Sequence, residues 1–311
     1  MTDGPSNPVL HKQLHPSLQL LLLIILTFFM LIIGLSISKF IIIHSYGANT
    51  FNSIMDPNNL ANQSESVLWI FQLTTTTLPL LITPLFFSYI IMREPDQYLK
   101  TSFNFPWVLI AVVFFIMLFS NPLMEFIGNV NQAINLPQWM IEQEKQLQEA
   151  SDDMLQMNSI WAMLFDLFLI GFLTAVAEEF LFRGCMQTIF TRWMKNKHAA
   201  IWTTAILFSA FHMEFFGFLP RLLLGVFFGY FVAWSGSVWT SVWAHFVNNG
   251  AVVIITYLFQ HKLSNINPDA NHNFTYVGYI ISFIITLFLL FIYRYISNKR
   301  QLAEIHGEEL G

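Results

Sequence analysis

The sequence predicts an all-α, polytopic integral membrane protein of about eight transmembrane helices, with a core bundle that carries a buried polar site. Of its 311 residues, 55% are hydrophobic and 11% are charged, and the mean hydropathy is +0.55. A water-soluble domain carries about 25% charged residues, so the composition indicates that the lipid bilayer surrounds this chain. The formal net charge of −5 provides no basic surface for nucleic acid, which is therefore not expected as a partner.

Eight apolar segments have the length or nearly the length of a membrane span. We predict spans at residues 18–43, 67–92, 107–127, 160–182, 199–215, 219–234, 237–259 and 276–296. The fifth is borderline and the sixth is short, so seven spans remain an alternative. For the third span an early end is expected, because Asn121, Pro122 and Glu125 interrupt its apolar run.

Lysine and arginine residues assign the two sides of the membrane. They gather in alternate loops and beside the two termini, as Lys12, Arg93, Lys100, Arg192, Lys195, Lys197, Arg294, Lys299 and Arg300. The other loops hold few: residues 44–65 have none, and residues 128–159 have only Lys145. The positive-inside rule therefore predicts that both termini are cytoplasmic.

These observations divide the chain into four segments. A cytoplasmic tail (1–17) precedes N-terminal spans with an outer loop (18–157), a core that carries the polar motifs (158–260), and a last span with a cytoplasmic tail (261–311). Within the outer loop, residues 138–157 have the pattern of an amphipathic helix. Such a helix is more often a solvated connector than a lid over a substrate entrance, and both interpretations remain open.

Two adjacent glutamates lie inside the fourth span, in the run AVAEEFLFR. A charge near the middle of a membrane helix costs about 2.5–3.5 kcal/mol on insertion scales. Arg183 follows Glu179 by four residues, so these two side chains can form an ion pair. Glu178 points about 100° away from its neighbour and has no such partner. An uncompensated carboxylate in the membrane indicates a functional residue.

Two later spans each carry polar residues on one face. Phe208 and His212 are four residues apart, as are His245 and Asn249, and this spacing places each pair on one side of its helix. Taken singly, each histidine is explained as well by packing or hydrogen bonding between helices. Together with Glu178 they form a hydrolytic set, in which a glutamate takes a proton from water and imidazole and amide groups orient that water or stabilise an oxyanion.

Glu178, His212 and His245 are also a candidate ligand set for zinc or another divalent metal. The metalloprotease sequence His-Glu-x-x-His is absent, so that motif gives zinc no support. A shared site requires His212 to lie within about 12 Å of Glu178. To bring the three residues to one depth, the helices around residues 186–203 are expected to extend beyond the cytoplasmic surface.

Three motifs follow one another within residues 174–249: Glu178-Glu179-x-x-x-Arg183, Phe208-x-x-x-His212 and His245-x-x-x-Asn249. In this order they resemble the motifs of the CAAX prenyl endopeptidase and bacteriocin-processing family (CPBP, or Abi) of intramembrane proteases. The resemblance implies a helical bundle around a site open towards the cytoplasm, and we expect the protein in the plasma membrane of a prokaryote. It also implies hydrolysis of peptide bonds in membrane-associated protein or peptide substrates.

The resemblance further implies a role for each motif residue. Glu178 would activate water, and Glu179 and Arg183 would form a supporting ion pair. The remaining residues, which would position the water or stabilise the tetrahedral intermediate, are His212, His245 and Asn249. Whether a metal is needed stays open within the family.

Two other classes of function remain open. One is a non-enzymatic membrane protein that acts in bacteriocin immunity or as a regulatory scaffold. The other is a secondary transporter, which would use the buried carboxylates for proton coupling. A transporter of this kind often has inverted repeats, and the sequence shows none. The substrate and the oligomeric state are not apparent from the sequence.

Overall fold

The computed structural model describes residues 14–56, 63–267 and 274–306, with side chains described up to residue 299. Over these residues the protein is all-helical, as the composition predicted. The principal α-helices are α1 (Pro16–Tyr46), α2 (Ala48–Ile54), α3 (Glu65–Gln72), α4 (Leu78–Phe86), α5 (Pro95–Leu99), α6 (Val108–Gln132), α7 (Gln138–Met154), α8 (Ile160–Asp166), α9 (Thr174–Glu179), α10 (Gln187–Met194), α11 (Lys197–Phe211), α12 (Phe218–Ser235), α13 (Trp239–Gln260) and α14 (Tyr276–His306). The predicted N-terminal tail up to residue 13, including Lys12, and the last part of the C-terminal tail lie outside the described residues.

Several of these helices join through π-helical turns into longer rods. The turns are η2 (Leu73–Thr77), η3 (Phe87–Met92), η4 (Leu167–Leu173) and η5 (Phe180–Met186). Thr74 Oγ1 donates to the Ile70 carbonyl and Thr75 Oγ1 to the Phe71 carbonyl, each at 2.7 Å, just before Pro79. These bonds serve carbonyls of the turn before η2, whereas the carbonyl that Pro79 leaves without a helix donor is that of Thr75.

Within the described residues, seven helical segments are long and apolar enough to cross a membrane: Pro16–Tyr46, Glu65–Met92, Val108–Gln132, Ile160–Met194, Phe218–Ser235, Trp239–Gln260 and Tyr276–Lys299. Each corresponds to a predicted span. The predicted fifth span is α11, which has only 15 residues and is therefore about 22 Å long. This is shorter than the roughly 30 Å hydrocarbon core, so the structure has seven long helices and one short one.

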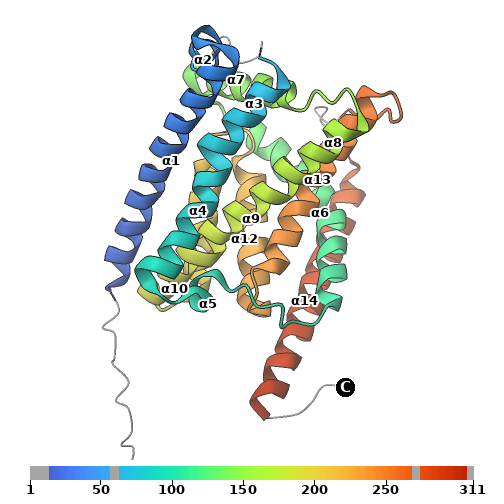
Figure 1. The fold of residues 1–311 in the computed structure, drawn as a ribbon. Helices are drawn as coiled ribbons and strands as arrows, with labels where there is room; N and C mark the ends of the chain where they lie inside the picture. Colours follow the sequence, from blue (N-terminus) through green and yellow to red (C-terminus); the bar gives the residue numbers. More distant parts are fainter. Residues whose placement is uncertain (1–13, 57–62, 268–273, 307–311) are drawn as a thin grey trace, which may run out of the picture.

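The outer helices present apolar side chains to their surroundings. Phe28 and Ile32 of α1 are each 64% exposed, and Phe291 of α14 is 66% exposed. In lipid such side chains lie among acyl chains of similar polarity, so a helix that is apolar on every side is stable there. Figure 1 shows α1 and α14 at opposite edges of the bundle, with α9 and α12 between them.

The predicted early end of the third span is wrong, because α6 continues through Pro122. A proline inside a helix cannot donate its backbone hydrogen bond and displaces the neighbouring ones. Here Ser282 of α14 repairs the gap: its hydroxyl donates to the Phe119 carbonyl at 2.6 Å and accepts from the Leu123 amide at 3.1 Å. A side chain from a distant part of the chain therefore allows the helix to continue.

The two ends of the bundle differ. One end, here called the basic end, carries α5, α10, the start of α1 and the end of α14 (Figure 1). The opposite end, called the α7 end, carries α2, α7 and the end of α13. Gln260, the last residue of α13, donates from Nε2 to the Leu155 carbonyl directly after α7, at 2.7 Å.

Candidate active site

Both glutamates of the fourth predicted span are buried in the middle of the long helical segment Ile160–Met194. They occupy the last two positions of α9, between the π turns η4 and η5. Turns of this kind occur frequently at functional sites, where they change the direction of side chains. The segment has 35 residues and is about 52 Å long, which supports the expectation that it extends beyond the membrane.

Glu179 is the centre of a buried charge network. Its Oε1 accepts from Arg183 Nη1 at 2.7 Å and lies 3.0 Å from His245 Nδ1. Arg183 also donates from Nη2 to the Gly225 carbonyl at 3.2 Å, and its guanidinium lies 4.1 Å from the ring centre of Phe208. Glu179 and Arg183 are both 0% exposed. The ion pair predicted from their spacing is therefore present, and it extends to His245.

Gly225 and Gly229 let α12 approach this network closely. A Cβ atom at Gly225 would lie 3.3 Å from Arg183 Nη2, and one at Gly229 would lie 2.7 Å from Ile201 Cγ2. The close helix contact that their four-residue spacing predicts is confirmed. Its consequence for the site is that the α12 backbone accepts a hydrogen bond from Arg183.

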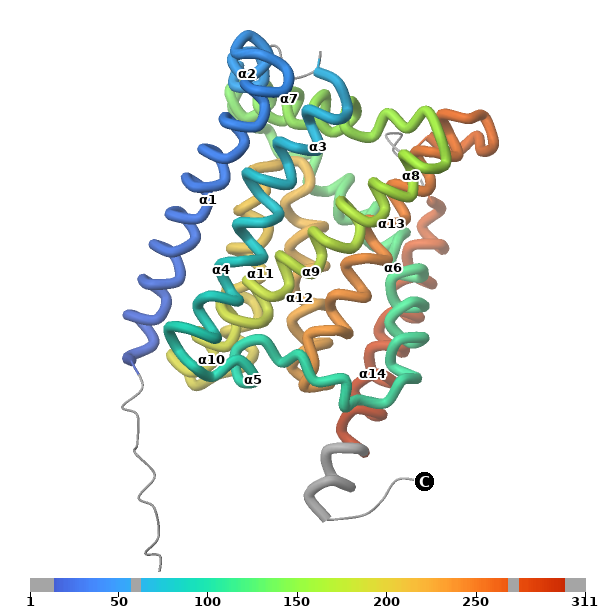
Figure 2. Tube along the Cα trace, in the orientation of Figure 1, coloured from blue at the N-terminus to red at the C-terminus, as the bar shows by residue number. Residues whose placement is uncertain are grey.

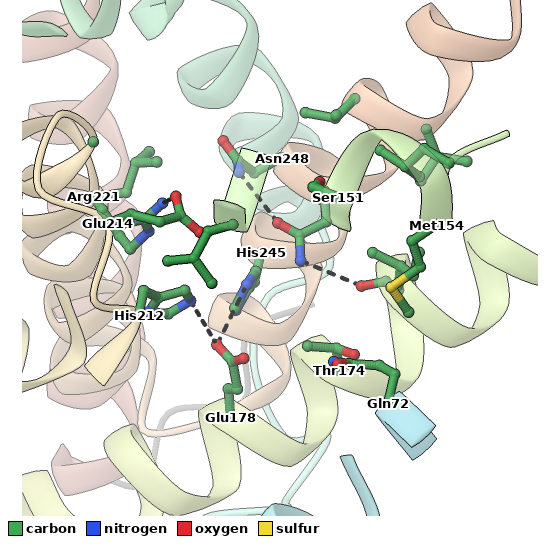
Figure 3. A pocket seen from close by; sticks show the side chains of 18 of the residues that line it. Gln72, Ser151, Met154, Thr174, Glu178, His212, Glu214, Arg221, His245 and Asn248 are labelled. Carbon is green, nitrogen blue, oxygen red and sulfur yellow. Dashed lines mark hydrogen bonds and ion pairs between the residues drawn. The ribbon is translucent and has the colours of Figure 1, made fainter. Parts of the chain in front are cut away.

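Glu178 faces the two histidines. Its Oε2 lies 3.7 Å from His212 Nε2 and 3.9 Å from His245 Nε2, as Figure 3 shows. This oxygen is buried and has no hydrogen-bond partner. The predicted convergence of the three side chains is thus confirmed, since His212 lies far inside the 12 Å limit.

The hydrogen-bond partners of the two Nδ1 atoms determine on which ring nitrogen each imidazole carries its hydrogen, and therefore whether the Nε2 atom that faces Glu178 has one. His212 Nδ1 lies 2.9 Å from the Phe208 carbonyl oxygen, and His245 Nδ1 contacts the Glu179 carboxylate. Both partners are acceptors, so each Nδ1 carries a hydrogen. In the neutral rings both Nε2 atoms then present lone pairs to the Glu178 oxygen. Three acceptors face one another, an arrangement that requires a shared proton, a water molecule or a cation between them.

Asn249 lies on the same wall, one helical turn beyond His245. Its Nδ2 donates to the Ile170 carbonyl at 3.3 Å, and its Oδ1 accepts from Asn248 Nδ2 at 3.3 Å. An amide nitrogen carries two hydrogens, so one remains for a ligand after the bond to Ile170. The structure brings Asn249 to the site but does not place it in contact with Glu178.

These side chains line a cavity of about 630 Å³. Leu147, Ala150, Ser151 and Met154 of α7 form part of its wall, so the amphipathic helix of the outer loop covers the site. Ser151 is exposed, which shows that the cavity reaches the surface at α7. The sequence offered both a lid and a solvated connector for this helix, and its place on the wall favours the lid.

A second charged pair lies beside His212. Arg221 and Glu214 form an ion pair and both line the cavity. The sequence alone indicated no role for either residue. Because Glu214 precedes α12 and Arg221 lies in its first turn, only the fold of the intervening loop brings the two together.

The donor atoms of Glu178, His212 and His245 fit a divalent metal in type. Zinc with bonds of about 2.0–2.1 Å holds its ligand atoms roughly 3.3–3.5 Å apart, slightly less than the distances seen here. The partnerless Glu178 oxygen and the two lone pairs are the groups that a cation would contact. In the part of the chain that the structure describes, no three His, Cys, Asp or Glu side chains have the geometry of a metal site. A zinc or other divalent ion therefore stays a prediction.

Fold and site together define a helical membrane protein with a buried glutamate that faces two imidazoles in a covered cavity. Residues 160–251 match the model of the family described as Type II CAAX prenyl endopeptidase Rce1-like, which confirms the resemblance drawn from the three motifs. The uncharacterized protein YpbD of Bacillus subtilis (strain 168) is 30% identical over 93 residues, which are 29% of this chain and 44% of that protein. The match thus spans less than half of that relative. No solved structure matches the fold.

Proposed function

We propose that the protein is an intramembrane endopeptidase that hydrolyses peptide bonds of membrane-associated proteins or peptides. The observation that carries this proposal is the partnerless, buried Glu178 oxygen between His212 Nε2 and His245 Nε2. Separations of 3.7 and 3.9 Å are too long for direct hydrogen bonds, and we place a bridging water between these groups, with a small outward movement of the side chains to accommodate it. The family match to residues 160–251 supports a protease at the level of the family.

In the proposed reaction Glu178 is the general base. It takes a proton from the bridging water while the water oxygen attacks the carbonyl carbon of the scissile bond, and it passes that proton to the leaving amine. The second hydrogen of this water is donated to the Nε2 of His212 or of His245, because a water carries two hydrogens, and this contact positions the water. The remaining amide hydrogen of Asn249 is available to donate to the oxyanion that develops on the carbonyl oxygen.

Glu179 and Arg183 are positioning residues in this mechanism. Glu179 Oε1 accepts from His245 Nδ1 and from Arg183 Nη1, and this holds the imidazole in one orientation and one tautomer. Arg183, which is fully buried, in turn holds the Glu179 carboxylate in place through its contact at 2.7 Å. The pair therefore acts on the reaction only through His245.

If the enzyme uses a divalent metal, Glu178, His212 and His245 would hold it. A bound zinc ion would supply an activated water, because it lowers the pKa of that water to about 7. A chelator distinguishes the two versions: removal of metal abolishes cleavage only in the metal-dependent one, and added zinc then restores it.

The test compares wild-type protein with Glu178→Gln in a bacterial host, by mapping the peptide termini of all membrane proteins. Asp166→Asn is the matched control, since Asp166 is a buried carboxylate of the same long helix that accepts from Trp69 Nε1 at 2.8 Å and does not line the cavity. New termini are expected with wild-type and Asp166→Asn protein and not with Glu178→Gln. If wild-type and Glu178→Gln cells have identical termini, the peptidase proposal is wrong, and a non-enzymatic immunity or scaffold role takes its place.

A further inference from the structure

The cavity lies on one side of Glu178. On α13 its wall consists of His245 and residues that follow it, up to Val253. On the long helix of Glu178 it consists of Thr174 and Ile170, which precede that residue. Figure 2 shows that α13 runs towards the α7 end, whereas the helix of Glu178 runs away from it. Both helices therefore contribute the parts that face the α7 end.

On the other side of Glu178 the bundle is closed by packed side chains. Phe182 and Cys185 are buried there in one apolar cluster with Leu99 and Val242. At the basic end itself, polar contacts tie three helices together. The Tyr98 hydroxyl of α5 donates to Gln19 Oε1 of α1 at 2.6 Å. The same hydroxyl accepts from Arg192 Nη1 of α10, also at 2.6 Å. A peptide that approached from the basic end would have to displace this layer.

The two ends also differ in charge. The turns and helix ends of the basic end carry Arg93, Lys100, Arg192, Lys195, Lys197, Arg294 and Lys299. The α7 end carries, in the described ranges, Lys39, Lys145, Arg221 and Lys262, and Arg221 is paired with Glu214. Basic loops stay on the cytoplasmic side of a membrane. The α7 end, and with it the cavity, then lies on the extracytoplasmic side.

Two expectations from the sequence therefore disagree in this fold. One expectation is that the site opens towards the cytoplasm, and the other is that the basic loops are cytoplasmic. Both hold only if the cavity and the basic loops lie at the same end of the bundle, and in the structure they lie at opposite ends. The charge bias rests on seven described residues at one end, whereas the cytoplasmic opening rests on the resemblance alone. We give the charge bias more weight.

We propose, on the basis of the peptidase function above, that the substrate enters from the extracytoplasmic side, between α7 and the bundle. The substrate class is then a peptide segment of an exported or membrane-anchored protein, with its scissile bond near the outer surface. Leu68, Phe71 and Val252 form apolar wall for its side chains, and Gln72 and Asn248 add polar groups that can pair with its backbone. A protein tail at the cytoplasmic surface would not reach Glu178.

The contacts of α7 place the entrance. Glu144 Oε2 accepts from the Phe215 backbone amide at 2.6 Å, and the rings of Trp139 and Phe215 meet at 5.7 Å. The first half of α7 is thus attached to the loop after His212, while Ser151 and Met154 in its second half border the cavity. We place the entrance beside this second half.

The first experiment tests which face carries the entrance. The chain has one cysteine, Cys185, which is fully buried, so added cysteines are labelled without background. Ser151→Cys borders the cavity, and Lys197→Cys is the matched control at the exposed start of α11. A membrane-impermeant maleimide should label Ser151→Cys in intact cells and Lys197→Cys only after permeabilisation. The reverse pattern overturns the proposal.

The second experiment finds the side of cleavage. Termini that depend on Glu178 are assigned to the outer or the cytoplasmic flank of each substrate, and at least ten times more are expected on the outer flank. Attachment of the bulky maleimide at Ser151→Cys should lower their yield at least tenfold, and attachment at Lys197→Cys after permeabilisation should leave it unchanged. Glu178-dependent termini on the cytoplasmic flank would refute outer access and leave the peptidase function intact. A complete absence of Glu178-dependent termini would refute both proposals.

Discussion

The two adjacent glutamates should differ in how the same substitution changes the stability of the protein. Glu179→Gln removes the negative charge that Arg183 contacts at 2.7 Å, where both side chains are 0% exposed. Breaking a buried pair by removing one partner costs about 3–5 kcal/mol. Arg183 keeps the Gly225 carbonyl and the face of Phe208, so we expect the lower end, about 3 kcal/mol. At roughly 2 °C per kcal/mol for a chain of this size, the melting temperature should fall by about 6 °C.

Glu178→Gln should behave differently. The Glu178 Oε2 atom has no hydrogen-bond partner, so removal of its charge abolishes a desolvation cost without breaking an ion pair. Its melting temperature should equal or exceed that of the wild type, although we expect the variant to be inactive. Proteins often lose stability at a strained or uncompensated group that their function requires, so removing that group raises stability and lowers activity.

Cys185 provides the assay for both variants. It is the chain's single cysteine and is 0% exposed, so a thiol-reactive fluorogenic dye reports its exposure as the purified protein unfolds in detergent. Arg183→Met and the double variant Glu179→Gln/Arg183→Met complete the cycle, and the double variant should lose at least about 1 kcal/mol less than the sum of the single losses. This account of the network is wrong if Glu179→Gln melts within about 1 °C of the wild type. It is also wrong if Glu178→Gln lowers the melting temperature by about the 6 °C expected for Glu179→Gln.

Three further predictions concern packing, helix repair and pH. Gly229→Ala would bring a Cβ within 2.7 Å of Ile201 and should destabilise the protein by about 1–3 kcal/mol, measured as a lower melting temperature. Ser282→Ala leaves the Leu123 amide without its partner and should cost about 1–3 kcal/mol, with faster hydrogen exchange at that amide. Lys100 lies in the turn after α5, where burial lowers its pKa from 10.5 to about 8. Between these two values the unfolded chain binds more protons, so stability should rise with pH from about 8 to 10.5, and Lys100→Met should remove this rise in a thermal melt followed by tryptophan fluorescence.

Each of these predictions has a result that contradicts it. Gly278→Ala is the packing control, because a Cβ there meets nothing closer than 3.5 Å; equal losses at both glycines would mean that the contact at Gly229 is unimportant. Unchanged exchange at Leu123 would show that Ser282 does not serve the helix. A rise in stability that persists in Lys100→Met would assign the pH dependence to another group.

Local pattern was sufficient for some elements and insufficient for others. The apolar runs predicted every long helix, because about 20 apolar residues are needed to cross the hydrocarbon core. The early end expected for α6 was wrong, because the group that repairs the helix at Pro122 is Ser282, about 160 positions later in the chain. Pro122 does disrupt the backbone hydrogen bonds of α6, as its chemistry predicts. The residues around it in the sequence gave no sign that the hydroxyl of Ser282 would replace them.

The same division holds for the site. Spacing of four residues was enough to predict the pair of Glu179 and Arg183, since the geometry of one helix determines it. That His245 lies against both glutamates depends on how α13 packs beside α9. The wall that α7 contributes depends on a contact between Glu144 and the backbone of Phe215, 71 positions apart.

The order of residues alone was thus enough to establish a helical membrane protein, its spans and the set of groups that carry the proposed chemistry. Composition and helical periodicity act over a few residues, and lipid imposes them on each span separately. Tertiary packing decided which side chains Glu178 faces, which nitrogen atoms point at it, and that the cavity lies opposite the basic end. These properties arise from contacts between helices far apart in the chain, where a change of a few ångströms decides whether two side chains meet.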